Sequence, residues 1–268
     1  MPELPEVETV RRLLAPAMQG ARFDDVVLRR RDLREPFPRR FRERVVGETA
    51  LSVDRRAKYL LVPLSSGETL LMHLGMSGWF RVNEGSDAPH AHVVFQMSSG
   101  AVVAFNDPRR FGLMDLVAAG NLATHPALSR LGPEPLSADF DGCALARACK
   151  GKRTPLKVAL LDQSVVAGVG NIYASEALHV AGLSPRRQAS TIATPSGLPR
   201  PSAHRLAAAI KKVLAEAIAR RAGNEYRGSR FRVYEREAER CRRAGCGGTI
   251  RRRTQAGRST FYCTVCQR

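Results

Sequence analysis

Four cysteines near the end of the chain limit its fold more than any other feature. They form two close pairs, Cys241 with Cys246 and Cys263 with Cys266, separated by 16 residues. The residues between the pairs, TIRRRTQAGRSTFY, have the pattern of two strands joined by a turn at Gln255–Gly257. Such a hairpin can hold four thiolates tetrahedrally around Zn²⁺. We predict one structural zinc ion, with two disulfides or unrelated free thiols as the alternatives.

The charge of the chain indicates its class of partner. Lys and Arg number 43 against 25 acidic residues, a formal net charge of +18. Over half of this excess lies in residues 220–268, which hold 14 Arg and four Glu. Such an excess favours a polyanionic partner, nucleic acid or an anionic membrane surface. The beginning, MPELPEVETVRR, has no apolar signal region, and no apolar run is long enough for a membrane span. We therefore expect a cytoplasmic protein with nucleic acid as partner.

Hydrophobic periodicity divides the chain into a first helix, a strand-rich part and a helical part. Apolar residues at helical spacing follow Pro5, and Gly20 is a plausible stop. Residues 22–117 are strand-rich, with two apolar hairpins folded around Ser-Ser-Gly, which predicts a β-sandwich or flattened barrel. Helices are predicted at 139–149, 154–163, 171–181 and 202–221. Cys143 and Cys149 fall in the first of these without partners at ligand spacing, so we expect core thiols.

These patterns predict an α+β multidomain protein. The expected domains are 1–117, an N-terminal helix plus β-sandwich; 118–230, a helical domain; and 231–268, a zinc β-hairpin.

Pro2 and the two carboxylates after it are a candidate catalytic group. Removal of Met1 would expose a secondary amine, which titrates roughly two to three pH units below lysine. Attack of this amine on a sugar C1′ would give a cationic iminium, an electron sink. Glu3 and Glu6 are positioned to donate a proton and to orient the amine. The ordinary alternative is that these carboxylates only cap the first helix.

Several segments, in order, resemble bacterial formamidopyrimidine-DNA glycosylases: MPELPEVETVRR, AKYLL, HLGMSG, NDPRRFG, LGPEPL, DQSVVAGVGNIYASEAL, FRVYEREAERC and GRSTFYCTVCQ. The resemblance implies a helix–two-turns–helix in the middle domain. It also implies excision of oxidised or ring-opened purines from double-stranded DNA and β,δ-elimination at the abasic site, by a monomer. Leu4 favours this branch over endonuclease VIII relatives, which act on oxidised pyrimidines and usually begin MPEGPE. A non-catalytic zinc protein that binds damaged DNA is the rival from another class.

The resemblance also implies roles for individual residues. Pro2 is the nucleophile, Glu3 the general acid and Glu6 a supporting carboxylate. Lys58 serves β-elimination and phosphate contact, and Arg258 serves δ-elimination. A trio enters the duplex as a wedge, with its arginine facing the orphaned cytosine: Met76, Arg109 and Phe111. Further expected DNA contacts are His73, His90, Asn171 and Tyr173.

Basic residues before the helix–two-turns–helix predict a cationic approach to the same groove: Lys150, Lys152, Arg153 and Lys157. For Arg109, an ion pair with Asp107 is the structural alternative to a role in the wedge. A solvated helix face is the alternative for the lysines.

The chain departs from the family pattern at two places. Four residues separate Cys241 from Cys246, whereas two are commoner; both spacings can close a tetrahedral site. Between Gly223 and Phe231 only a short stretch replaces the longer segment that covers the extruded purine in the family. The second departure weakens the expected preference for 8-oxoguanine.

Overall fold

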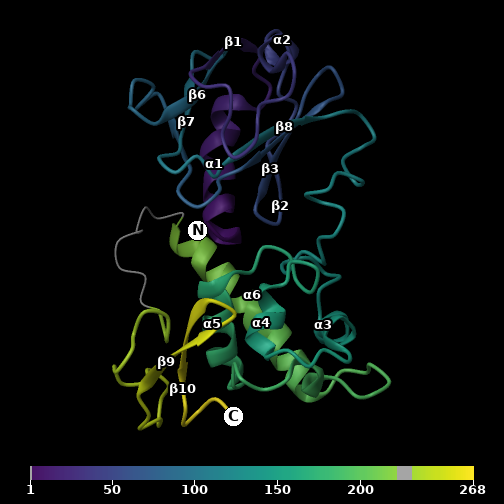
Figure 1. Cartoon of the computed structure of the whole chain (residues 1–268), viewed down its shortest axis with the longest axis vertical. Coiled ribbons are helices and arrows are strands. Elements are labelled where there is room, and N and C mark those ends of the chain that lie inside the picture. The colour runs from purple at the N-terminus through teal and green to yellow at the C-terminus, as the bar shows by residue number, and fades with distance from the viewer. Residues whose placement is uncertain (1, 222–230) are drawn as a thin grey trace. The chain divides into compact units, whose positions relative to one another are not determined.

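The computed structural model describes residues 2–221 and 231–268, so the shortened stretch between Gly223 and Phe231 lies outside the described residues. The chain forms two compact units, Met1–Ser129 and Arg130–Arg268 (Figure 1). The first unit holds the helix and the sheets, and the second holds the remaining long helices and the cysteine-bearing hairpin.

The first unit begins with helix α1 (Leu4–Met18). Its start is fixed by Pro5 in the first turn and by a capping box between Glu3 and Glu6, in which the Glu6 carboxylate accepts from the Glu3 backbone N–H at 2.8 Å. Val7 and Leu14 on one face are fully buried. The predicted first helix is confirmed.

Two antiparallel four-stranded sheets follow. The first has the order β1 (Phe23–Leu28), β6 (Ala91–Met97), β7 (Val102–Asn106) and β5 (Trp79–Val82). The second has the order β2 (Asp54–Arg56), β3 (Tyr59–Pro63), β4 (Thr69–His73) and β8 (Leu113–Val117). The two Ser-Ser-Gly turns join β3 to β4 and β6 to β7, and Gly67 and Gly100 take the positive φ that such turns need. A short helix, α2 (Phe41–Val45), lies outside the sheets.

Helix α1 contacts β5 of one sheet and β2 and β3 of the other, and it lies between the two sheets in Figure 1. One continuous core joins all three parts, with Phe95 and Phe105 from the first sheet and Leu60 and Leu70 from the second. The residues at the start of α1 are therefore held by the core beneath them.

The second unit is built on α-helices at the predicted places: α3 (Gly142–Cys149), α4 (Leu156–Leu161), α5 (Asn171–Ala181) and α6 (Pro201–Arg221). A short 3₁₀ helix, η1 (Ala189–Ile192), lies outside the predicted helices. Helix α5 contacts α4 and α6. It ends at Gly182, whose φ of 69° allows the left-handed cap. No helix among the residues that the structure describes is long and apolar enough to cross a membrane.

Strands β9 (Ile250–Gln255) and β10 (Arg258–Cys263) form the predicted hairpin. Ala256 and Gly257 between them both have positive φ, 46° and 72°, as a two-residue turn of type I′ requires. Strand β10 packs on α5. The predicted fold, a helix with a β-sandwich followed by a helical part and a cysteine hairpin, is confirmed.

Candidate functional site and zinc centre

The start of α1 places Pro2 beside a buried acid. Pro2 is half-buried and the Glu3 side chain is almost fully enclosed, with 2% of the residue exposed. The Glu6 carboxylate holds the Glu3 backbone through the hydrogen bond of the capping box. Capping and catalysis therefore do not exclude each other here, because the cap fixes the residue whose side chain is the candidate acid.

Glu8 anchors this end of α1 to the second sheet. Its carboxylate accepts from Arg11 and Arg12 on α1 and from Arg55 on β2, at 3.3 Å to the Arg55 Nε. Burial raises the pKa of Glu8, but the hydrogen bonds from these arginines outweigh burial and hold the pKa below its ordinary value. Helix α1 is thus tied to the strand that leads into Lys58.

Lys58 occupies the two-residue turn between β2 and β3 and is only 6% exposed. The preceding Ala57 has φ of 53°, the left-handed region that non-glycine residues rarely adopt. Lysine side chains are rarely this deeply buried unless their charge is paired or has a function. The turn therefore holds one amine in a fixed place within the first unit.

His73, at the end of β4, is neutral in this setting. Burial, with smaller contributions from the charges of Lys58 and Arg34, lowers its pKa to about 4. Its Nδ1 accepts from the Gly75 backbone N–H at 3.0 Å, and its ring lies 4.8 Å from the Tyr59 ring. Tyr59, the residue after Lys58, is paired with His73 in the sheet, so these two predicted site residues lie near each other.

The structure brings the predicted wedge residues together on two touching loops. Met76 and Phe111 are 39% and 44% exposed, and the Arg109 guanidinium lies over the Phe111 ring at 4.9 Å. The loops meet at Gly75, where an added Cβ would lie 2.3 Å from the Phe111 carbonyl carbon. Only glycine permits this approach.

Asp107 holds these loops in place. It is fully buried, and its carboxylate accepts from Ser77 Oγ and from the Gly112 N–H, both at 2.7 Å. Its own backbone N–H donates to the His90 carbonyl at 2.9 Å. Among the described residues no ion pair joins Asp107 to Arg109, whose guanidinium lies over the Phe111 ring instead. Sequence reasoning missed this positioning role, although an acid inside an otherwise turn-forming motif was a signal.

In the second unit, Asn171 begins α5, and a buried lysine locks it to the hairpin. Lys157 Nζ donates to Asn171 Oδ1, to Thr260 Oγ1 at 2.9 Å and to the Ser259 carbonyl at 3.0 Å. Lys157 is 0% exposed. Its predicted place in a basic surface is wrong, because its ammonium is used inside the unit to join α4, α5 and β10.

The other predicted contacts of the second unit differ in exposure. Lys152 is half-buried and pairs with Asp162 at 3.3 Å, while Arg153 is exposed. Tyr173 is only 3% exposed. Arg258 is exposed where β10 leaves its turn.

The four predicted cysteines form a site that fits zinc. Their Sγ atoms all lie within 4.8 Å of one another, with 3.8 Å between Cys241 and Cys266 and 3.6 Å between Cys246 and Cys263. Four sulfurs about 2.3 Å from a tetrahedral Zn²⁺ are about 3.8 Å apart. Gly248 leaves room for them, because an added Cβ would lie 2.6 Å from the Cys263 Sγ. Zinc bound here would fix the hairpin.

The cysteines outside this site behave as structural thiols. Cys149 is fully buried, and burial raises the pKa of its thiol to about 11. Cys143 is half-buried, and both are free.

Three family models match successive parts of the chain. The formamidopyrimidine-DNA glycosylase N-terminal domain matches residues 1–114, the formamidopyrimidine-DNA glycosylase H2TH domain matches residues 131–227, and the zinc finger found in FPG and IleRS matches residues 238–268.

Curated relatives named formamidopyrimidine-DNA glycosylase match the whole chain. Those of Beijerinckia indica and Rhodopseudomonas palustris strain BisA53 are each 54% identical, with all of both chains covered. The alignment with the first spans 290 positions against the 268 residues of this chain, so at least 22 positions have no counterpart here.

Solved structures agree with this similarity. MutM in complex with carbocyclic 8-oxo-G containing DNA has a TM-score of 0.87 at 30% identity, with all of both chains covered. The Lactococcus lactis enzyme with Fapy-dG containing DNA has a TM-score of 0.85 at 30% identity, covering 99% and 100%. The same enzyme bound to AP site containing DNA has a TM-score of 0.83 at 30% identity, covering 99% of each chain. With family models along its length and relatives 54% identical over all of it, this chain belongs to the formamidopyrimidine-DNA glycosylase family.

Proposed function

We propose that this chain is a bifunctional DNA glycosylase that removes oxidised or ring-opened purines and then nicks the strand at the abasic site. The observation that carries the proposal is a nearly enclosed carboxyl group, Glu3, next to Pro2 at the fixed start of α1. The relatives share the family, and solved members are bound to DNA that contains 8-oxo-G, Fapy-dG or an AP site. Pure DNA binding needs none of the three groups Pro2, Glu3 and Lys58.

The chemistry follows from the groups present. Once Met1 is removed, the Pro2 nitrogen attacks C1′, the C1′–N9 bond breaks, and the base leaves with a proton for which Glu3 is the proposed donor. The C1′–O4′ bond then breaks, O4′ takes a proton, and the opened sugar is held as an iminium. The iminium withdraws electrons, so a proton is lost from C2′ and the 3′ phosphate leaves in β-elimination, which nicks the strand. Loss of a proton from C4′ and departure of the 5′ phosphate in δ-elimination then detach the sugar and leave a one-nucleotide gap. Lys58 is proposed to assist the first elimination and Arg258 the second.

The exposed wedge residues support a substrate base that leaves the helix. Extruding a nucleotide leaves a gap in the duplex, and apolar side chains inserted between base steps can fill it. Met76 and Phe111 expose much of their apolar surface on loops held by Asp107. We propose that they enter the gap while Arg109 faces the orphaned cytosine. The further proposed contacts with the DNA are His73, His90, Lys152, Arg153, Asn171 and Tyr173.

The shortened stretch between Gly223 and Phe231 supports a weaker preference for 8-oxoguanine. The relatives' longer alignments are consistent with missing residues in this chain. Each hydrogen bond lost to the edge of an extruded base costs about 0.5–1.5 kcal/mol, roughly 2- to 12-fold in rate. We propose normal action on abasic sites and ring-opened purines, whose weakened glycosidic bond demands less of the pocket, and reduced action on 8-oxoguanine.

Single-turnover rates on duplexes with 8-oxoguanine, a formamidopyrimidine, an oxidised pyrimidine or an abasic site test the proposal. The wild type should act on both purine lesions and on the abasic site, and Glu3→Gln should slow base release while the abasic site is still nicked. A rate on the oxidised pyrimidine above both purine rates would favour the endonuclease VIII-like alternative. If the Met1-processed protein incises none of these duplexes, the alternative of a non-catalytic protein that binds damaged DNA is favoured.

We also propose that the protein acts as a monomer in the cytoplasm, associated with the nucleoid, and that its domains are 1–117, 118–230 and 231–268. The surplus of positive charge supports the association with DNA. Sedimentation of the free protein and imaging of a fluorescent fusion would test the first two points.

A further inference from the structure

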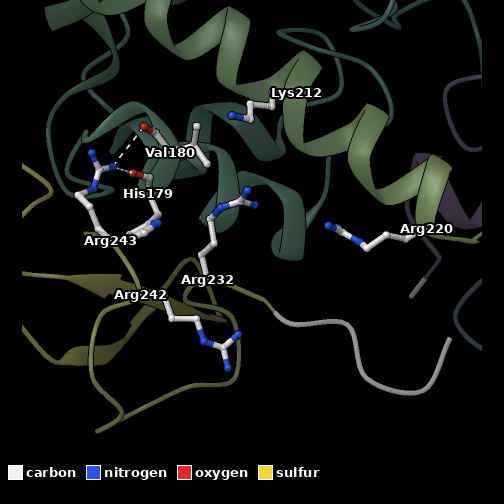
Figure 2. A pocket seen from close by; sticks show the side chains of 7 residues that line it. All are labelled: His179, Val180, Lys212, Arg220, Arg232, Arg242 and Arg243. Atoms are coloured by element: carbon white, nitrogen blue, oxygen red, sulfur yellow. Dashed lines mark hydrogen bonds between the residues drawn. The ribbon is translucent and has the colours of Figure 1, made fainter. Parts of the chain in front are cut away.

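The second unit contains a cationic pocket that the proposed chemistry does not use. It has a volume of about 530 Å³ and is shown in Figure 2. Its cationic lining residues come from α6 and from the segment around the first zinc pair: Lys212, Arg220, Arg232, Arg242 and Arg243. His179 and Val180, near the end of α5, complete the lining. We propose that this pocket binds an acidic peptide segment of a partner protein.

The pocket is separate from the proposed DNA contacts of its own unit. Asn171 begins α5, and His179 lies eight residues later, about 12 Å along the helix axis. A phosphate held at the start of α5 would therefore not occupy the pocket at its other end. The pocket thus offers positive charge to a second ligand.

The wide spacing of the first zinc pair builds one wall of the pocket. Arg242 and Arg243 lie among the four residues that separate Cys241 from Cys246, where the family more often has two. Arg243 donates to the carbonyls of His179 and Val180, the latter at 3.2 Å, and so caps the end of α5 (Figure 2). The loop thereby reaches α5 and contributes two cations to the wall.

Acidic groups near the pocket leave most of its charge available. Glu216 is 3.0 Å from Arg232 and 3.9 Å from Arg220. Lys212 is exposed and has no ion pair or hydrogen bond within the described part of the chain. Glu176 also lies 4.0 Å from Arg232, so two carboxylates are set against five cations, and the site still attracts a ligand with several negative charges.

The shape and lining favour a peptide over nucleic acid. A duplex is too wide to enter a hollow of about 530 Å³, whereas a single extended chain can. Single-stranded nucleic acid is held mainly by base stacking on aromatic side chains, and no Phe, Tyr or Trp lines the pocket as far as the described residues go. Arg clusters are a common means of recognising acidic peptide motifs.

Fluorescence anisotropy with a labelled octapeptide of alternating Asp and Glu tests the proposal. The zinc-loaded full chain is first saturated with a duplex containing a stable abasic analogue, so that the proposed DNA-binding surface is filled. Lys212→Glu and Arg242→Glu should each weaken peptide binding at least tenfold. Arg205→Glu, the same charge change on an exposed part of α6 away from the pocket, should change binding less than twofold.

Activity and folding are measured on the same variants. Lys212→Glu should nick an abasic duplex within twofold of the wild-type rate, with unchanged zinc content and thermal midpoint. If the protein binds no duplex, only the proposed function is contradicted. Peptide binding by the pocket is then measured with the free protein. The pocket proposal is overturned if the wild type does not bind the peptide, or if Arg205→Glu weakens binding as much as Lys212→Glu. It is also overturned if a single-stranded dodecanucleotide displaces the peptide at a lower concentration than the unlabelled peptide does.

Discussion

At the scale of single residues, His73 shows how burial and a neighbouring charge fix a protonation state. Its pKa of about 4 lies below the ordinary value near 6.5, so between these pH values the unfolded chain binds the proton and the folded protein does not. The free energy of unfolding should therefore fall as pH decreases from about 6.5 to 4. NMR titration of the ring should give a midpoint below 5.5. Because the Lys58 charge lowers this pKa, Lys58→Gln should raise the midpoint; an ordinary midpoint near 6.5 in the wild type would contradict this account.

Asp107 offers a second test at this scale. Asn in its place keeps the shape but presents an N–H₂ donor where either Ser77 or Gly112 now donates. One of the two hydrogen bonds is then lost, so the two wedge loops should no longer be held in their observed positions. Asp107→Asn should slow excision of a formamidopyrimidine by roughly tenfold or more, the effect of one to two lost hydrogen bonds. Nicking of a preformed abasic site should change less than threefold. Ser77→Ala, which removes only one of the two bonds, should have a smaller effect. Equal losses on both substrates would show that Asp107 supports the fold as a whole.

At the scale of elements, the zinc hairpin contains a matched pair of neighbouring glycines. A Cβ at Gly248 would lie 2.6 Å from the Cys263 Sγ, whereas a Cβ at Gly247 meets nothing within 4 Å. Gly248→Ala should therefore weaken zinc binding roughly tenfold or more, a typical cost of disturbing the surroundings of a ligand. Competition with a chelator measures this change, and Gly247→Ala is the control. Equal zinc affinity in both variants would show that Cys263 is not held where the structure places it.

Elements that depend on local chemistry could be predicted from the sequence. The hairpins follow from their Ser-Ser-Gly turns and from Ala256 and Gly257, and the zinc site follows from cysteine spacing. Elements that depend on distant partners could not. The sequence places Lys157 on a basic surface, because nothing near it in the chain indicates that it bonds to Thr260, 103 residues away. Glu176 accepts from three successive backbone N–H groups beginning at Arg232, and no local pattern indicates this.

At the scale of the whole molecule, a strongly cationic chain carries its proposed reactive groups at its first residues. The net charge of +18 supports binding to DNA of any sequence, and the family motifs supply the site residues. The roles of Pro2, Glu3, Lys58 and Arg258 stay predictions. Burial of Glu3 and Lys58 in the same unit is consistent with those roles.

Borohydride trapping on an abasic duplex tests the central claim most directly. Reduction of the iminium should give a stable protein–DNA adduct, and peptide mapping should place the new bond on the Pro2 nitrogen. Protein that retains Met1 should form no adduct and should not nick, because its proline nitrogen lies in a peptide bond. An adduct on Lys58, or full nicking by the Met1-retaining protein, would contradict the mechanism.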